Sequence, residues 1–260
     1  MSHVIAIAGR EIRSFFLSPV AYVVLTLWSF LAGVVFLSGL VAFQEQLFRA
    51  QQFQAFDFLR EMNLNDHVIM PFLGTMWIVL LFLIPAVTMG LFASEKSNGT
   101  DELLLTSPLT IWEIVLGKFL AGSAFALLMT AIVTFFPALL FIFGDPELGK
   151  TAAGLLGILL VSLAYVAVGA FASSVTRNQL IAFILSMVLL LVFGLMLPYL
   201  AGEAAGIPGL SGAMQWVSTA VHYENLLKGL VESQDLVYFA VVIGIFLLLS
   251  KAAVESIRWR

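Results

Sequence analysis

The chain contains no cysteine and only three histidines, at positions 3, 67 and 222. Without cysteine there is no disulfide framework, no thiol nucleophile and no thiolate metal site. The three histidines are too dispersed along the sequence to form a recognisable metal-binding motif. These shortages exclude a disulfide-stabilised domain and thiol catalysis.

Charged residues are also scarce, at 11% of the 260 residues, against about 25% in an ordinary soluble domain. The 12 lysines and arginines are scattered singly or in pairs, so there is no basic stripe of the kind that binds nucleic acid. Hydrophobic residues make up 61% of the chain, and the mean hydropathy is +1.05. A water-soluble fold could not bury that much apolar surface, so we expect an all-α integral membrane protein.

Six long apolar runs predict six transmembrane helices. A spanning helix needs about 20 apolar residues, because the hydrocarbon core is about 30 Å thick and each residue rises about 1.5 Å. The last run is short, but the stem of Lys251 can reach the interface. Segment 204–223 is uncharged but rich in glycine, so we expect it to be a surface or re-entrant segment rather than a seventh span. The predicted spans are about 19–43, 68–93, 117–143, 151–174, 179–201 and 236–254.

Lysine and arginine in the connecting segments predict the orientation. With the N-terminus inside, the cytoplasmic side carries eight of them: Arg10, Arg13, Lys96, Lys118, Arg177, Lys251, Arg258 and Arg260. The outer side carries four: Arg49, Arg60, Lys150 and Lys228. This excess predicts that both termini are cytoplasmic, in a bacterial inner membrane. Segment 94–116 is then a cytoplasmic loop, and 44–67 and 202–235 are extracytoplasmic.

Residues 1–18 predict an amphipathic helix that lies along the cytoplasmic membrane surface. Its apolar face would carry Val4, Ile5, Ala8, Ile12, Phe15 and Phe16, and its polar face His3, Arg10, Arg13 and Ser14. Arg10 and Arg13 either set the topology alone or have a specific interfacial role. Both interpretations keep the N-terminus inside.

One motif is misleading. Residues 144–151 read GDPELGKT and match the phosphate-binding pattern G-x-x-x-x-G-K-T. That loop requires a strand before it and a soluble helix after it, whereas this octet joins two predicted spans on the outer side. We expect a turn in which Gly144 ends a helix and Lys150 lies at the headgroups. The energy for any transport must then come from another protein.

The cytoplasmic loop 94–116 contains a short helix between two breaks. Asn98 and Gly99 predict a turn, Thr100 can cap a new helix, and the acidic residues 101–102 suit its first turn. Residues 107–108, Ser-Pro, end that helix. Its three leucines cannot form a core of their own, so they need either a partner protein or the bilayer interface.

The next helix is predicted to begin at a capping box formed by Thr110 and Glu113. Residues 95–108 read EKSNGTDELLLTSP, and residues 112–118 read WEIVLGK. Together they closely resemble the signature loop of type 2 ABC-transporter permeases, E-x-x-x-G-T-x-E-x-L-x-x-S-P followed by E-I-x-x-G-K. The resemblance extends over the N-terminal helix, the six spans and the total length, and so over nearly the whole chain.

This resemblance implies a type 2 ABC exporter fold, with residues 101–106 as the coupling helix that contacts an ATPase. The chain would have no nucleotide-binding domain and would not be an enzyme by itself. It would pair with a second permease subunit, identical or different, and with two ABC ATPase subunits that hold ATP and Mg. No cofactor or metal is expected on this chain. The coupling residues implied are Glu95, Gly99, Thr100, Asp101, Glu102, Leu103, Leu104, Leu105, Ser107, Pro108, Glu113 and Lys118.

Two further segments resemble the gliding-motility-associated branch of these permeases. They are FFLSPVAY at 15–22 and TAVHYENLLKGLV at 219–231, the latter followed by DLVY at 235–238. A branch name does not determine the cargo.

The outer segments carry their own candidates. Segment 43–66 contains five phenylalanines between glutamines and acids, which we interpret as interfacial anchoring rather than as a docking surface for a periplasmic accessory protein. His222, Tyr223 and Glu224 are candidates for an extracytoplasmic gate or substrate contact. A purely structural pair of His222 with Glu224 is the alternative.

Other classes of membrane protein fit less well. The apolar runs contain no ionisable residue, which disfavours an ion-coupled transporter, and no catalytic constellation for an intramembrane enzyme. The function expected is therefore the permease subunit of an ATP-driven exporter, embedded in membrane lipid and moving a lipid-like, polymeric or other amphiphilic substrate. The alternative is a transport-inactive scaffold or a mechanotransmitting subunit of a secretion or motility assembly.

Overall fold

The computed structural model describes residues 2–54, 62–100, 109–203, 207 and 210–257. Within these ranges no residue lies in a β-strand, so the prediction of an all-α fold is confirmed. The elements are α1 Ser2–Leu17, α2 Pro19–Gln52, η1 Asn65–Ile69, α4 Met70–Thr88, α5 Gly90–Ser97, α7 Ile111–Phe143, α8 Leu148–Val175, α9 Gln179–Leu191, η2 Val192–Met196, α10 Leu197–Glu203, α11 Leu210–Val217, α12 Thr219–Leu227 and α13 Ser233–Ile257.

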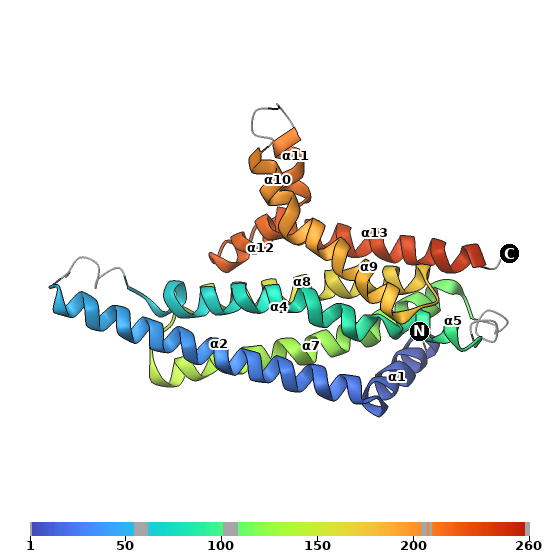
Figure 1. The fold of residues 1–260 in the computed structure, drawn as a ribbon, viewed down its shortest axis with the longest axis horizontal. Helices are drawn as coiled ribbons and strands as arrows, with labels where there is room; N and C mark the ends of the chain where they lie inside the picture. The colour runs from blue at the N-terminus through green and yellow to red at the C-terminus, as the bar shows by residue number, and fades with distance from the viewer. Residues whose placement is uncertain (1, 55–61, 101–108, 204–206, 208–209, 258–260) are drawn as a thin grey trace.

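Six helical stretches of the described chain are long and apolar enough to cross a membrane, which confirms the predicted number. They are Pro19–Gln52, Asn65–Ser97, Ile111–Phe143, Leu148–Val175, Gln179–Gly202 and Ser233–Ser256. Figure 1 shows both ends of the chain and α5 at one end of the bundle, which we call the terminal end. The junction between α7 and α8 lies at the opposite, distal end (Figure 1).

The first two helices are separated by a Ser-Pro pair that is visible in the sequence. Ser18 is the N-cap of α2, its Oγ accepts a hydrogen bond from Val20 N at 3.3 Å, and Pro19 follows at the first helical position. α2 then continues to Gln52, past the end expected near residue 43. Its 34 residues are about 51 Å long, so its distal part extends beyond a hydrocarbon core about 30 Å thick.

The inner helices of the bundle are α4 and α8. In the most apolar part of each of these two spanning stretches, 67% of the residues are buried. In the stretch that begins with α9, the corresponding share is 22%. α8 packs closely because small residues face its neighbours: a Cβ at Gly169 would lie 2.0 Å from Thr88 Oγ1, and one at Gly154 would lie 2.8 Å from Leu73 Cδ1. Close packing of this kind drives helix association in membranes, where lipid supplies no hydrophobic driving force.

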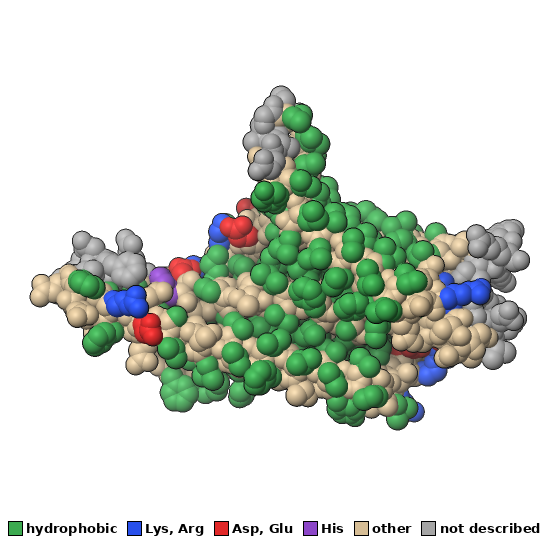
Figure 2. All heavy atoms as spheres, viewed as in Figure 1, with side chains coloured by type: hydrophobic (Ala, Val, Ile, Leu, Met, Phe, Trp, Pro, Cys, Tyr) green, Lys and Arg blue, Asp and Glu red, His purple; other side chains and the backbone are tan. Residues whose placement is uncertain are grey.

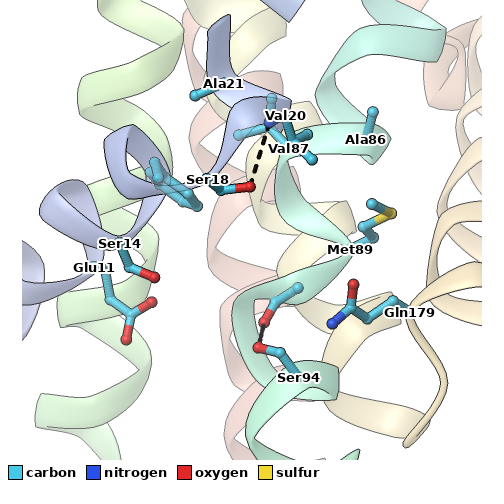
Figure 3. Close-up of a pocket in the computed structure, with 12 residues that line it drawn as sticks. Glu11, Ser14, Ser18, Val20, Ala21, Ala86, Val87, Met89, Ser94 and Gln179 are labelled. Carbon is cyan, nitrogen blue, oxygen red and sulfur yellow. Dashed lines mark hydrogen bonds between the residues drawn. The ribbon is translucent and has the colours of Figure 1, made fainter. Parts of the chain in front are cut away.

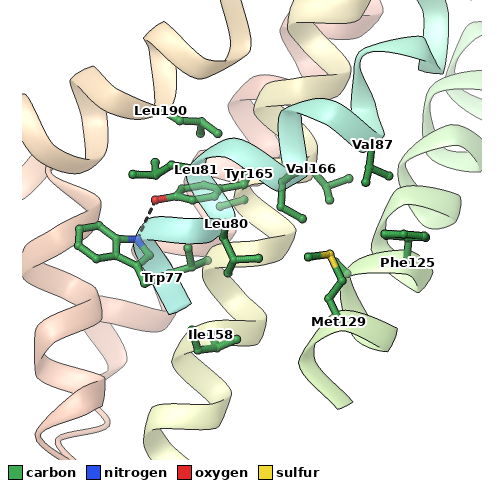
Figure 4. Packing of buried hydrophobic residues seen from close by; sticks show 14 of the residues in the cluster. Trp77, Leu80, Leu81, Val87, Phe125, Met129, Ile158, Tyr165, Val166 and Leu190 are labelled. Atoms are coloured by element: carbon green, nitrogen blue, oxygen red, sulfur yellow. Dashed lines mark hydrogen bonds between the residues drawn. The ribbon is translucent and has the colours of Figure 1, made fainter. Parts of the chain in front are cut away.

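Two tryptophan N–H groups of the core have partners within it. Trp77 Nε1 donates a hydrogen bond to the hydroxyl of Tyr165 at 2.7 Å, which joins α4 to α8 (Figure 4). Trp28 Nε1 donates to the carbonyl of Met129 at 2.8 Å, which joins α2 to α7. Figure 4 shows the surrounding layer of leucine, valine and phenylalanine side chains. An unpaired polar group in this environment costs several kcal/mol, roughly, so these bonds fix which helix faces meet.

Residues 197–217 depart from the bundle axis. α10 and α11 stand out sideways from the bundle, before α12 and α13 return to it (Figure 1). α11 has eight residues and α12 has nine, so each is only about 12–14 Å long and cannot span the membrane. Figure 2 shows hydrophobic side chains over the middle of the bundle, with the charged side chains of that face near its two ends and at the base of the projection.

Candidate coupling site

A buried ion cluster at the terminal end joins three helices. Nζ of Lys118 in α7 lies 3.0 Å from Glu11 Oε1 in α1 and 3.0 Å from Glu95 Oε2 in α5. The same Nζ donates to the carbonyl of Leu91 at 2.5 Å. The Lys118 side chain is only 1% exposed, so these three oxygens replace the water that would otherwise solvate the ammonium group.

Arg10 completes the cluster from its solvent-facing side. One guanidinium nitrogen of Arg10 lies 2.9 Å from Glu11 Oε1 and 2.9 Å from Glu95 Oε1. Two cations therefore face two carboxylates, and the cluster has no net charge. Removing one partner from such a group leaves an uncompensated buried charge, which typically costs about 3–5 kcal/mol.

The two ends of the predicted coupling loop both belong to this cluster. Glu95 lies in the last turn of α5, just before the loop, and Lys118 lies in the second turn of α7, just after it. The direct contact between them closes the loop at its base, and Glu11 and Arg10 attach that base to α1. The base of the loop is therefore joined to three helices.

The structure contains both turn signals that flank the loop. Gly99 has φ +69°, a conformation that glycine adopts readily, and Thr100 N donates to the carbonyl of Glu95 at 3.0 Å. Thr110 and Glu113 form the predicted capping box, with Thr110 N donating to Glu113 Oε2 at 2.8 Å and Glu113 N donating to Thr110 Oγ1 at 3.3 Å. The remaining predicted coupling residues lie outside the described ranges: Asp101, Glu102, Leu103, Leu104, Leu105, Ser107 and Pro108.

The N-terminal helix packs on α7. Ile5, which belongs to the apolar face predicted to meet the membrane surface, is 66% exposed from the bundle, whereas Ile7 faces α7 and is only 8% exposed. The reason is Gly117 of α7, which leaves room for the Ile7 side chain: a Cβ there would lie 2.7 Å from it. Phe15 and Phe16 also contact α7, with ring centroids 5.8 and 6.3 Å from that of Phe125.

Arg13 is not among the residues of the ion cluster. It is exposed and lines a shallow groove along α1. A cavity of about 170 Å³ lies on the side of α1 that faces α4, α5 and α9. Figure 3 shows Glu11, Ser14, Ser94 and Gln179 around its polar part, and apolar side chains of α2 and α4 around the rest.

The comparison with known families agrees with this geometry. The family model described as ABC-2 family transporter protein matches residues 5–254, from α1 to the end of α13. The chain belongs to the ABC-2 transporter family. No curated protein matches it. Members of this family are membrane-spanning permease subunits that lack an ATPase domain and associate with ABC ATPase subunits, so this is a multi-pass permease subunit.

The predicted outer gate of this ABC-2 protein has a different arrangement from the one expected. Glu224 pairs with Lys228 at 2.6 Å, not with His222, and both members are half exposed. His222 instead pairs with Asp235, with Nδ1 2.6 Å from Oδ1, and its Nε2 lies 2.9 Å from the carbonyl of Trp216. Both ring nitrogens therefore have an oxygen partner, one from α13 and one from α11.

Tyr223 is part of the core rather than of an opening. It is 1% exposed, its hydroxyl donates to the carbonyl of Leu73 at 3.0 Å, and its ring lies 5.5 Å from that of Trp77. The three predicted gate residues therefore do not form one group. His222 and Asp235 hold α11, α12 and α13 together, and Tyr223 holds α12 to α4.

Two ionisable residues at the edges of the predicted apolar runs are buried within the bundle. Asp235 lies in the first turn of α13, within a spanning stretch, and is 1% exposed. Lys118 lies within the α7 stretch and is equally buried. Both lie near helix ends, and both have partners from neighbouring helices, so they serve as interhelical ion pairs.

The phosphate-loop lookalike is a turn with its polar groups already engaged. Gly144 is the C-cap of α7, as expected, and α8 begins at Leu148. Lys150 Nζ lies 2.5 Å from Asp66 Oδ1, and the Thr151 hydroxyl accepts a hydrogen bond from Asn65 Nδ2 at 2.9 Å. The lysine and threonine that would bind phosphate and magnesium in a true phosphate loop are occupied by η1.

Sequence reasoning missed two residues of these sites: Glu11 and Asp235. Glu11 was detectable in principle, because it is the one acid of the N-terminal helix and follows Arg10 directly. Asp235 carries no local signal, because its role depends on groups distant in the sequence.

Proposed function

We propose that this ABC-2 permease subunit belongs to an ATP-driven exporter in which two ABC ATPase subunits, each holding ATP and Mg, act on the loop between α5 and α7. The observation that carries this proposal is the buried cluster of Arg10, Glu11, Glu95 and Lys118. It brackets the loop that would contact an ATPase and connects the base of that loop to α1 as well as to the two spans. A force applied at the loop would therefore move helices as rigid bodies.

The orientation follows from the same end of the molecule. Both chain ends and α5 lie at the terminal end (Figure 1), and the excess of lysine and arginine is predicted on that side. We infer that the terminal end is cytoplasmic and that the membrane is a bacterial inner membrane. The distal end, with Asp66 and Lys150, would face the periplasm and would be available to an accessory protein there.

The cargo class follows from the character of the spans. Of the polar groups buried in the described part of the chain, those near mid-span are mainly hydroxyls bonded to backbone or aromatic groups. A path lined by such helices, shared with a second permease subunit in a dimer, suits a lipid-like, polymeric or other amphiphilic substrate better than a small ion. The segments at 15–22 and 219–231 favour the gliding-motility-associated branch of the family.

The test is reconstitution of the permease with its cognate ABC ATPase in lipid nanodiscs, followed by measurement of ATP hydrolysis with and without the permease. We expect a stable complex in which the permease accelerates hydrolysis. Replacing both Leu103 and Leu104 by Asp, or Glu102 by Arg, should leave membrane insertion intact and remove the acceleration. Acceleration at the wild-type level in the Leu103→Asp, Leu104→Asp variant would overturn the assignment of the coupling helix. A complex that forms without any acceleration would favour the scaffold function instead.

A further inference from the structure

The second spanning stretch is broken near its terminal end. α4 ends at Thr88, Met89 separates the two helices, and α5 begins at Gly90. Pro85 lies one turn before the break and has no N–H to donate to the preceding turn. The helix axis therefore changes within a spanning stretch, just before the segment that carries Glu95 into the coupling loop.

A single serine from α8 lies in this break. The hydroxyl of Ser173 donates to the carbonyl of Met89 at 2.8 Å and accepts from the backbone N–H groups of Phe92 at 2.9 Å and Ala93 at 3.0 Å. A hydroxyl has one hydrogen to donate and two lone pairs, so all of its hydrogen-bonding capacity is used. Ser173 is fully buried, which excludes water as a substitute partner.

The position of this hydroxyl is informative. In a continuous α-helix, Phe92 N would donate directly to Thr88 O, because the donor is four residues after the acceptor. α4 ends at Thr88, and Phe92 N donates to the Ser173 hydroxyl instead. The same hydroxyl also bonds to Met89 and Ala93. Insertion of a side chain into the backbone ladder is a known physical cause of sharp helix kinks.

Two further contacts hold α5 from the same neighbours. The ammonium group of Lys96 donates to the carbonyl of Ser174, which is one of the unpaired carbonyls at the end of α8. Lys118 of α7 donates to the carbonyl of Leu91. α5 is thus held as a separate short helix by side chains and backbone of α7 and α8.

There is also space beside α5. The cavity of about 170 Å³ is lined by Met89, Gly90 and Ser94 from this stretch, by Glu11 from α1 and by Gln179 from α9. Figure 3 shows Glu11 and Gln179 on opposite sides of the view. α5 could swing into this space without displacing core side chains. A fixed pivot on one side and free volume on the other are the requirements of a lever.

We propose that Ser173 is a positioning residue for energy coupling. Its hydroxyl keeps the second span open between Thr88 and Phe92, sets the angle of α5 against α8, and so transmits movement of the coupling loop to the central helix. The effect on energy coupling rests on the proposed function, whereas the effect on the position of α5 does not. Without the hydroxyl, Phe92 N bonds directly to Thr88 O, α5 straightens onto α4, and Glu95 moves away from Lys118.

The experiment compares Ser173→Ala with Ser174→Ala. Ser174 is equally buried, but its hydroxyl donates only to the carbonyl of Phe171 in its own helix, at 2.7 Å. The two variants therefore remove a hydroxyl from neighbouring positions, and only the Ser173 hydroxyl contacts α5. Ser173→Thr, which keeps the hydroxyl, serves as the rescue variant.

Two readouts separate this inference from the proposed function. The first is the distance between spin labels at Ser97→Cys on α5 and Ala252→Cys on α13, both exposed, measured in nanodiscs without the ATPase. The chain has no other cysteine, so the labels are unambiguous. The second is permease-dependent ATP hydrolysis by the complex.

We expect Ser173→Ala to shift the label distance and to lower the accelerated part of ATP hydrolysis about tenfold, while Ser174→Ala and Ser173→Thr match the wild type. An unchanged label distance in Ser173→Ala, or an equal change in Ser174→Ala, overturns the inference whatever the ATPase does. A shifted distance in a complex whose wild type does not accelerate hydrolysis would keep the pivot and overturn the proposed function. If Ser173→Ala is not inserted in the membrane while Ser173→Thr behaves as the wild type, the hydroxyl is needed for folding, and the positioning role is overturned.

Discussion

Nζ of Lys118 and Oε2 of Glu95 lie 3.0 Å apart, although 22 residues lie between them in the chain. The contact joins the end of one spanning stretch to the start of the next and leaves the loop between them as a closed unit. A loop whose two ends are joined can move as one body. In a loop whose ends are not joined, changes in its own backbone would take up the movement.

Replacing Lys118 by Met should destabilise the permease by about 3–5 kcal/mol, because Glu11 and Glu95 would keep their charges with only Arg10 to compensate. The measurement is thermal unfolding in detergent, followed by tryptophan fluorescence. Lys251→Met is the matched control, since its pair with Glu255 is partly exposed at 3.7 Å and should contribute about 1 kcal/mol or less. Equal losses in the two variants would contradict the role of the cluster.

Replacing Asp235 by Asn should lower the unfolding temperature more than replacing Glu224 by Gln. Asp235 is buried against the His222 ring and also accepts from Asn225 Nδ2 at 3.3 Å, so its replacement weakens a buried hydrogen-bond network that joins α12 to α13. Glu224 pairs with Lys228 at the surface, where such pairs contribute about 0–1 kcal/mol. A larger effect from Glu224→Gln would restore the predicted gate pair.

Replacing Lys150 by Met should leave the dependence of the complex on ATP concentration unchanged. The ammonium group of Lys150 is bound to Asp66, and the loop that holds it lies at the distal end of the molecule, opposite α5. The check is the ATP concentration at half-maximal hydrolysis. A severalfold rise in that concentration would mean that the 144–151 segment binds nucleotide after all.

Replacing Gly169 by Ala should destabilise the bundle by about 1–3 kcal/mol, because the new methyl group would overlap Thr88 of α4. Gly149 has no neighbouring atom within 4 Å of an added Cβ. Gly149→Ala should therefore be neutral or slightly stabilising, since alanine favours a helix over glycine by about 1 kcal/mol. Retention of full stability in Gly169→Ala would mean that α4 and α8 can separate at no cost.

Features that depend on residues close together in the sequence predicted the structure well. The capping box at Thr110 and Glu113 depends on residues three positions apart, and the helix end at Gly144 on the adjacent Asp-Pro. The number of spans follows from apolar length alone. In each case, the groups that interact are neighbours along the chain, so no knowledge of the packing was needed.

Pairings across the bundle were not predictable in the same way. His222 has Glu224 two residues away, yet two residues on a helix point in different directions, and the acid that reaches the ring comes from α13. The face of α1 that packs on α7 was not predictable for a similar reason, because Gly117 of another helix decides where an isoleucine fits. Periodicity identifies an apolar face only approximately when the partner surface is unknown.

The sequence by itself determined that this is a six-span membrane protein, that its loop between α5 and α7 begins and ends with helix-capping signals, and which family it belongs to, because hydrophobic length, capping and motif are all local properties. Only the tertiary structure decided that Arg10, Glu11, Glu95 and Lys118 form one cluster and that Ser173 occupies the break in the second span. In a low-dielectric interior, each of these polar groups needs a partner, and the partner is selected by how helices pack in space rather than by their order in the chain.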